Sequence, residues 1–126
     1  NTTEAICSGA TFATTPTNGS DIVPAGTTYT WTVATNANVT GQSAQATAQS
    51  SISQTLVNTT NAVEQVVYTV TPTAGSCAGS TFTITTTVNP TPSVTAQTAT
   101  ICSGAAFTVA PVNGSGNIVP AGTQYT

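Results

Sequence analysis

The sequence predicts an all-β protein whose short strands pack as the two sheets of a sandwich. Val, Ile, Thr and aromatic residues alternate in short runs that Gly, Pro and Asn separate, which is the pattern of half-buried strands. No segment has a convincing helical pattern. Apolar residues make up 38% of the chain, which is enough for a modest core. Threonine fills about a quarter of all positions and suits the solvated faces of the sheets.

The first predicted strands lead into the clearest one. Residues 12–15 form a short strand after a Cys-Ser-Gly turn. Pro24 and Gly26 then occupy the second and fourth positions of a type I turn. This turn leads into a strand over residues 27–34, in which Tyr, Trp and Val alternate with Thr. One face of that strand is therefore apolar and the other is hydroxylated.

The later strands follow a polar stretch. Residues 36–50 are small, polar and poorly patterned, which predicts a loop with one weak strand at residues 38–41. Alternation returns in a strand over residues 51–57. Two long strands, over residues 63–72 and 81–88, complete the predicted set.

The number and order of these strands indicate an immunoglobulin-like β-sandwich. About seven short strands within about 95 residues, one Trp in an early central strand and two long final strands are typical of that fold. Each aromatic residue could instead belong to a ligand platform, but its alternate position in a strand favours the core. The predicted core residues are Tyr29, Trp31, Val33, Ile52, Leu56, Val66, Tyr68, Val70, Phe82 and Ile84.

Part of the sequence occurs twice. Residues 6–20 match residues 101–115 at 10 of 15 positions with an offset of 95. Residues 22–30 match residues 118–126 at 8 of 9 positions with an offset of 96. A period of this size exceeds that of solenoid repeats, so it predicts a string of small domains.

The repeat divides the chain into three parts. Residues 1–89 form the first repeat, and we leave open whether its first strand is complete. Residues 90–92 form a stiff linker, because proline cannot donate to a sheet, and residues 93–126 begin the next repeat. The second copy stops at Thr126, so we expect the natural molecule to be longer or to be completed by another chain. The residues that mark the linker are Asn89, Pro90 and Pro92.

The composition excludes most kinds of chemistry. The chain has no Lys, Arg or His, and its three acids, Glu4, Asp21 and Glu64, lie far apart in the sequence. Acid–base catalysis, divalent metal sites and nucleic-acid binding each need groups that this chain does not supply. We therefore expect no enzyme activity, no cofactor, no metal and no nucleic-acid partner. No run of 18 apolar residues occurs, so we expect no membrane insertion.

The cysteines favour an oxidising, extracellular setting. Cys7 and Cys77 fall in the first repeat, and Cys102 is the copy of Cys7. A Cys7–Cys77 disulfide would close a loop of about 70 residues and stabilise the fold by roughly 4 kcal/mol. Cys102 would then pair with a residue outside the chain or stay unpaired. A disulfide implies an oxidising compartment. The alternative is that these cysteines are buried free thiols.

Four segments carry a family resemblance. ICSGATF, IVPAGTTYTW, SISQTLVNTTNAVEQVVYTVTP and GSCAGSTFTITTTVNPTPSV resemble, in order and spacing, the PKD-like repeats of giant surface proteins in the Bacteroidetes, including adhesins of gliding flavobacteria. The resemblance implies an immunoglobulin-like sandwich that is exported to the cell surface, commonly by the type IX secretion route, in long tandem arrays. Ordinary PKD domains carry a Trp-Asp-Phe-Gly-Asp-Gly motif where this chain has Trp31-Thr32-Val33, so no role of those acids is transferred.

Three functions fit these observations. The leading one is a structural repeat of a long extracellular fibre or adhesin stalk, whose partners are neighbouring identical repeats and whose other regions contact surface polysaccharide. The second is a carbohydrate- or surface-binding module, which would need exposed aromatic side chains. The third is a self-assembling filament subunit, in which residues 93–126 complete a neighbouring molecule by strand exchange.

Overall fold

Ten β-strands make up the regular structure of the described part of the chain. The computed structural model describes residues 1–19 and 21–126. None of these residues belongs to a helix long and apolar enough to cross a membrane. The strands are β1 (Thr2–Cys7), β2 (Thr11–Thr14), β3 (Thr28–Ala34), β4 (Val39–Thr40), β5 (Gln45–Gln49), β6 (Ile52–Thr55), β7 (Val57–Asn58), β8 (Glu64–Ala74), β9 (Cys77–Ala78) and β10 (Phe82–Asn89).

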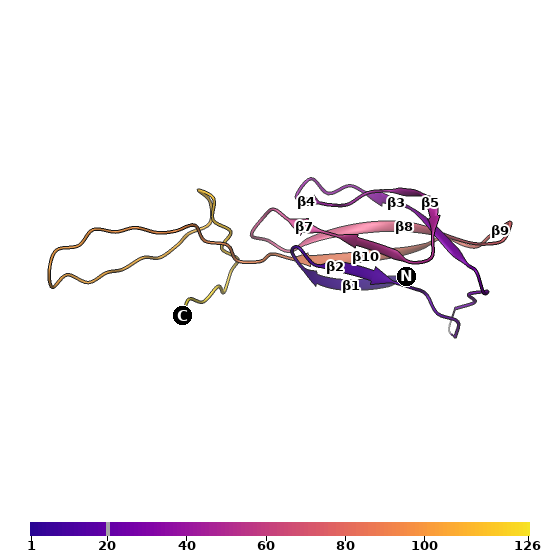
Figure 1. Ribbon diagram of the computed structural model, residues 1–126, viewed down its shortest axis with the longest axis horizontal. Helices are drawn as coiled ribbons and strands as arrows, with labels where there is room; N and C mark the ends of the chain where they lie inside the picture. The colour runs from indigo at the N-terminus through magenta and orange to yellow at the C-terminus, as the bar shows by residue number, and fades with distance from the viewer. Residues whose placement is uncertain (20) are drawn as a thin grey trace.

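The larger layer, here called the main sheet, has the strand order β1-β10-β8-β3-β5, and β9 also pairs with β8. The outer strand β1 runs parallel to β10, with Thr2 opposite Ile84 and Cys7 opposite Asn89. The other pairs in this sheet are antiparallel. Strands β1 and β10 therefore both begin at one end of the sandwich, here called the proximal end, and both finish at the other, the distal end (Figure 1).

The second layer consists of the pairs β2–β6 and β4–β7. Only Leu56 separates β6 from β7, and its backbone is bonded to the turn after β1. The Leu56 N–H donates to the Ala10 carbonyl at 3.2 Å, and its carbonyl accepts from Gly9 at 2.8 Å. The two short pairs therefore form one layer over the main sheet, and the predicted immunoglobulin-like β-sandwich is confirmed.

The core lies between the two layers. Eight of the ten predicted core side chains are buried, whereas Val33 and Phe82 are only partly buried and pack against the others. Sequence reasoning left out three buried apolar residues, Phe12, Val39 and Val88. The ring of Phe12 lies 5.3 Å from that of Tyr68, so β2 is anchored on the centre of the main sheet.

Three strands lie outside the predicted set. The prediction of an unpatterned loop at residues 45–49 is wrong, because these residues form β5 at the edge of the main sheet. Their side chains are Gln, Ala and Thr, so the alternation of apolar residues that signals a strand is absent. β1 and the two-residue β9 likewise carry few large apolar side chains, and backbone pairing with β10 and β8 places them in the sheet.

Thr86 offers a test of the core. Its side chain is fully buried in β10, and among the described residues its Oγ1 is a buried side-chain atom without a hydrogen-bond partner. A buried hydroxyl without a partner costs free energy that a methyl group does not. We expect Thr86→Val to raise the free energy of unfolding by about 1 kcal/mol, measured by urea denaturation. The control Thr85→Val, on the opposite and partly exposed face, should change it by less than about 0.5 kcal/mol. Destabilisation by Thr86→Val would contradict this prediction.

Candidate functional site: the two ends of the sandwich

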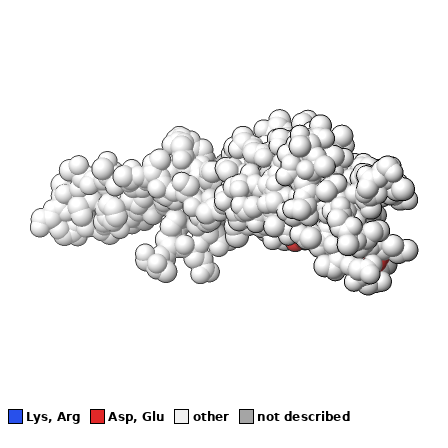
Figure 2. Space-filling model, turned by 45° about the vertical axis from the view of Figure 1, so that its right-hand side comes forward, with Lys and Arg blue, Asp and Glu red and all other residues white. Residues whose placement is uncertain are grey.

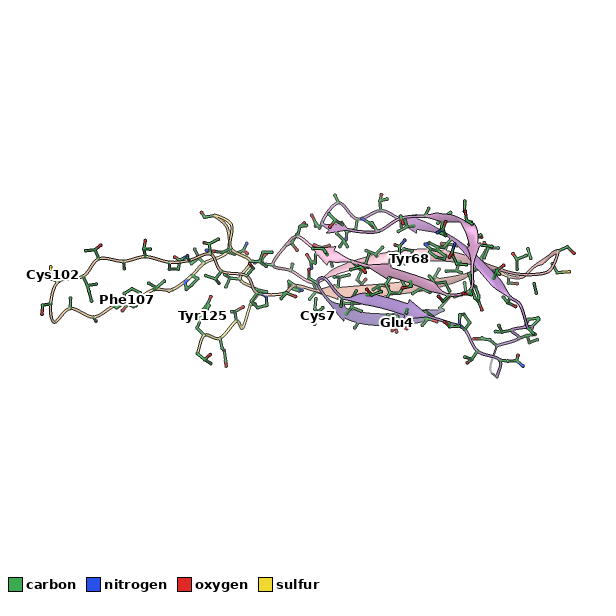
Figure 3. All side chains as sticks on the ribbon, in the orientation of Figure 1. Glu4, Cys7, Tyr68, Cys102, Phe107 and Tyr125 are labelled. Carbon is green, nitrogen blue, oxygen red and sulfur yellow. The ribbon has the colours of Figure 1, made fainter. Side chains whose placement is uncertain are left out.

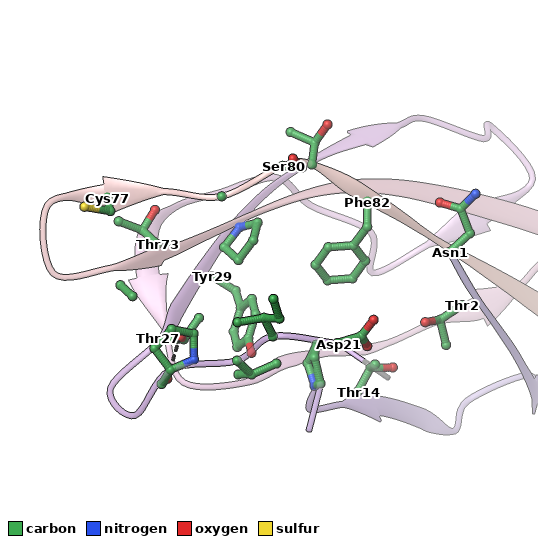
Figure 4. A pocket seen from close by; sticks show the side chains of 18 residues that line it. Asn1, Thr2, Thr14, Asp21, Thr27, Tyr29, Thr73, Cys77, Ser80 and Phe82 are labelled. Atoms are coloured by element: carbon green, nitrogen blue, oxygen red, sulfur yellow. Dashed lines mark hydrogen bonds between the residues drawn. The ribbon is translucent and has the colours of Figure 1, made fainter. Parts of the chain in front are cut away.

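The proximal end holds a cavity of about 780 Å³ (Figure 4). The ends of six strands meet there with the loop that precedes β3, and Tyr29 and Phe82 contribute aromatic rings. Burial, and secondarily the nearby Asp21 carboxylate, raise the pKa of the Tyr29 phenol. The remaining lining is mostly hydroxyl groups, proline rings and small side chains. Asp21 is the charged side chain of this lining.

The distal end fixes the direction of the linker. The Ser8 N–H donates to the Asn89 carbonyl at 2.8 Å, and the Asn89 side-chain amide donates to the Ile6 carbonyl at 3.3 Å. The Thr91 hydroxyl then donates to the Ser8 carbonyl at 3.3 Å. The first linker residues are therefore tied to the turn after β1. The chain leaves the sandwich along the direction of β10 (Figure 1).

The predicted Cys7–Cys77 disulfide is wrong. Both thiols are free and exposed, which also excludes the alternative of buried thiols. Cys7 is level with Asn89 at the distal end, whereas Cys77 pairs with Ala74 in the β8–β9 hairpin at the proximal end. The length of β10 separates them, more than about 20 Å at 3.3 Å per residue. A disulfide needs Cα atoms within about 7 Å, so the two cysteines of one repeat cannot reach each other.

Cys102, the third cysteine, is also free and exposed. It lies at the tip of the segment that continues beyond the linker, far from the sandwich, while Cys7 lies beside the linker (Figure 3). The two copies of this cysteine are therefore displaced from each other along the long axis of the molecule.

The aromatic residues of the first repeat serve its core. Phe12, Tyr29, Trp31 and Tyr68 are buried and Phe82 is partly buried. The exposed aromatic residues are Phe107 and Tyr125, at 59% and 55% exposure, and they are the second copies of Phe12 and Tyr29. Both residues lie outside the strands of the sandwich. The first repeat therefore presents no exposed aromatic platform on its described surface.

The polar atoms of two core aromatics are satisfied within the fold. The Tyr68 hydroxyl donates to Gln54 Oε1 at 2.8 Å, and the Trp31 indole N–H donates to the Ser43 carbonyl at 3.0 Å. Gln54 Nε2 donates to the same Ser43 carbonyl at 2.8 Å. Burial raises the pKa of Tyr68 to about 12, so it stays neutral at physiological pH. This network fastens the loop before β5 to the core.

Charge is almost absent from the surface. Figure 2 shows only two small acidic spots on the face in view and no basic side chain. Glu4, Asp21 and Glu64 do not gather, and the described residues contain no group of three acidic, Cys or His side chains that could hold a metal ion.

The Glu64 carboxylate joins two loops at the distal end by hydrogen bonds. Its carboxylate accepts hydrogen bonds from the side-chain amides of Asn36 at 2.8 Å and Asn38 at 2.9 Å. These bonds, with a smaller contribution from the Thr60 hydroxyl, hold the pKa of Glu64 below its ordinary value of 4.5. The loop before β4 and the loop before β8 are thereby joined beside the linker.

We expect Glu64 to make the stability depend on pH. Because the pKa is lowered on folding, the stabilisation is fully present above about pH 4.5 and is lost as the pH falls through the lower, folded-state value. Thermal midpoints measured between pH 2 and pH 7 should fall over the acid range. Glu64→Gln should flatten that part of the curve, whereas the control Asp21→Asn should retain it. An unchanged acid dependence in Glu64→Gln would contradict the assignment.

The fold and its two ends define an immunoglobulin-like structural module that passes the chain from one end to the other. Residues 4–92 match the family model of the PKD-like domain, and the chain belongs to this family. PKD-like domains are typically extracellular or surface modules, and domains of this type are generally non-catalytic. The comparisons with curated proteins and with solved structures gave no match.

Proposed function

We propose that this chain is a structural repeat of a long extracellular fibre or adhesin stalk, in which it acts as a non-catalytic mechanical spacer. One observation carries the proposal. Because β1 and β10 are parallel neighbours, the chain starts at the proximal end and leaves at the distal end. A following copy begins on the same long axis, where residues 93–126 lie (Figure 1). Repeats with this connectivity are added end to end.

The pairing of β1 with β10 gives the distance along the long axis from one repeat to the next. Thr2 is level with Ile84, and Gln97 is the second copy of Thr2 by the offset of 95. The thirteen residues from Ile84 to Gln97 span about 40 Å when extended at 3.3 Å per residue. The hydrogen bonds that hold Asn89 and Thr91, together with two prolines, keep the linker directed away from the sandwich.

The surface chemistry supports an exposed, long-lived spacer. Hydroxyl and amide groups keep the surface hydrated at any pH, and the absence of Lys and Arg removes every cleavage point for trypsin-like proteases. The family resemblance extends the proposal. The array belongs to a cell-surface adhesin of a gliding member of the Bacteroidetes, reaches the surface by the type IX route, and leaves contact with surface polysaccharide to other regions.

Small-angle scattering on polypeptides of two and four complete repeats tests the spacer. We expect the maximum dimension to grow by about 40 Å per repeat. Replacing Pro90 and Pro92 by glycine should reduce the maximum dimension and broaden the distribution of distances, without unfolding the repeats. Compact particles whose size grows slowly with repeat number would contradict the proposal. Saturable binding of glycans by the repeats alone would favour the carbohydrate-binding module instead.

A strand-exchanged filament subunit is the second candidate. It is favoured by the exposure of Ile101, Phe107 and Tyr125, whose partner strands would come from another molecule. The mass of the native polypeptide separates the two candidates. A mass near 12.4 kDa favours exchange, whereas a mass of hundreds of kilodaltons favours the covalent array.

A further inference from the structure

We propose that consecutive repeats are joined by a disulfide between the Cys7-type thiol at the distal end of one repeat and the Cys77-type thiol at the proximal end of the next. This inference rests on the proposed tandem array of complete repeats. Each repeat contains one exposed thiol at each end, and the two are too far apart to react within the repeat. In an end-to-end array the distal end of one repeat faces the proximal end of the next, so the two kinds of thiol face each other at every junction.

The strand register gives the axial distance between the two thiols of a junction. In a complete repeat, Tyr68 is paired with Ile84 and Ile84 is paired with Thr2, so these three residues are level with one another. β8 continues six residues beyond Tyr68 to Ala74, which is paired with Cys77. The β8–β9 hairpin of a following repeat therefore projects back toward the preceding one by about 20 Å.

The linker must span a similar length. Eight residues separate Asn89, which is level with Cys7, from Gln97, the copy of Thr2. Fully extended, they cover at most about 26 to 29 Å. The hairpin of the following repeat covers about 20 Å of this length. About 6 to 9 Å then remain along the axis between the Cys7-type and the Cys77-type positions, and any bend at the prolines shortens this distance. Cα atoms in disulfides lie 4.4 to about 7 Å apart, so the lower end of this axial gap lies within that range.

The start of the second copy already contacts the linker. The Ile118 N–H donates to the Ser93 carbonyl at 2.7 Å, and the Ser93 N–H donates to the Ile118 carbonyl at 2.9 Å. In the first copy the equivalent of Ile118 is Ile22, which lines the proximal cavity together with Cys77 and is 93% exposed. The loop that borders the Cys77-type position therefore docks on the linker, close to the distal end that carries Cys7.

Disulfide formation removes one proton and one electron from each thiol. The oxidant is an exchangeable disulfide, such as that of a thiol oxidoreductase, which accepts the two electrons and two protons and leaves as two thiols. Attack by the Cys7-type thiolate on that disulfide gives a mixed disulfide. The Cys77-type thiolate then displaces the reduced carrier and forms the bond between the repeats.

The test uses this chain continued after Thr126 by the sequence of residues 31–92, so that the second repeat is complete and four thiols are present. After equilibration with oxidised and reduced glutathione, free thiols are counted by alkylation and intact mass. We expect one internal disulfide and two alkylated thiols. Cys7→Ser should abolish the disulfide and leave three free thiols. The matched control Cys102→Ser, in the same Ile-Cys-Ser-Gly context, should keep the disulfide and leave one.

Several results would overturn the inference. These are four free thiols after oxidation, a disulfide that survives in Cys7→Ser, or disulfide-linked dimers in place of the internal bond. Scattering on the reduced polypeptide separates this failure from failure of the spacer. Free thiols in a particle that keeps the extended two-repeat length would refute only the disulfide, whereas a compact reduced particle would refute the end-to-end array as well.

Discussion

Gly41→Ala is expected to lower the free energy of unfolding by at least about 3 kcal/mol, or to prevent folding. Gly41 follows β4 and has a φ of 86°, a conformation that costs an L-residue about 1 kcal/mol or more. A Cβ at this position would also overlap the backbone carbonyl oxygen of Thr55. Thr55 is held in β6 by its pairing with Thr11, so the carbonyl cannot retreat without opening the second layer.

The matched control for this substitution is Gly26→Ala. Gly26 has a similar φ of 79°, but a Cβ there would meet no heavy atom within 4 Å. We therefore expect only the conformational cost, about 1 kcal/mol. Urea unfolding followed by Trp31 fluorescence measures both variants. Equal losses for Gly41→Ala and Gly26→Ala would show that the overlap with Thr55 is relieved by movement of the second layer.

Asn58→Leu is expected to destabilise the domain by about 3 to 5 kcal/mol, because the buried side chain of Asn58 forms four hydrogen bonds, one of them to the buried carbonyl of Val88. Asn58 is 1% exposed. Its Nδ2 donates to the carbonyls of Val88 at 2.9 Å and Ala62 at 2.7 Å. Its Oδ1 accepts from the N–H and the hydroxyl of Thr60 at 2.8 and 2.9 Å. Leucine has a similar size but can form none of these hydrogen bonds.

The variant Asn58→Asp separates packing from hydrogen bonding. It retains the acceptor for Thr60 but turns a carboxylate oxygen toward two carbonyl oxygens. A carboxyl group in these surroundings has a raised pKa in the folded protein. The variant is therefore most stable while this carboxyl group is protonated, and it loses stability as the pH rises through the raised pKa. Chemical unfolding at pH 4 and pH 7 should show Asn58→Asp closer to the original protein at the lower pH. The opposite order would contradict the assigned hydrogen bonds.

Local alternation decided which side of each strand faces the core. Tyr29 and Trp31 in β3, and Val66, Tyr68 and Val70 in β8, are buried because side chains two residues apart lie on the same face of a strand. This property depends only on neighbouring residues, so it can be read from the sequence. The same pattern misplaced Phe82, because its position at the start of β10 places it on the wall of the proximal cavity.

Strand pairing decided the features that bear on function. The sequence by itself determined most of the strands, most of the core, the repeat of about 95 residues and the absence of basic chemistry. It could not determine that β1 lies parallel to β10, because that contact joins residues about 80 positions apart. That contact places the start and the exit of the chain at opposite ends, and it separates Cys7 from Cys77. Periodicity describes the faces of a single strand, whereas the neighbours of a strand are selected by packing of the whole sandwich.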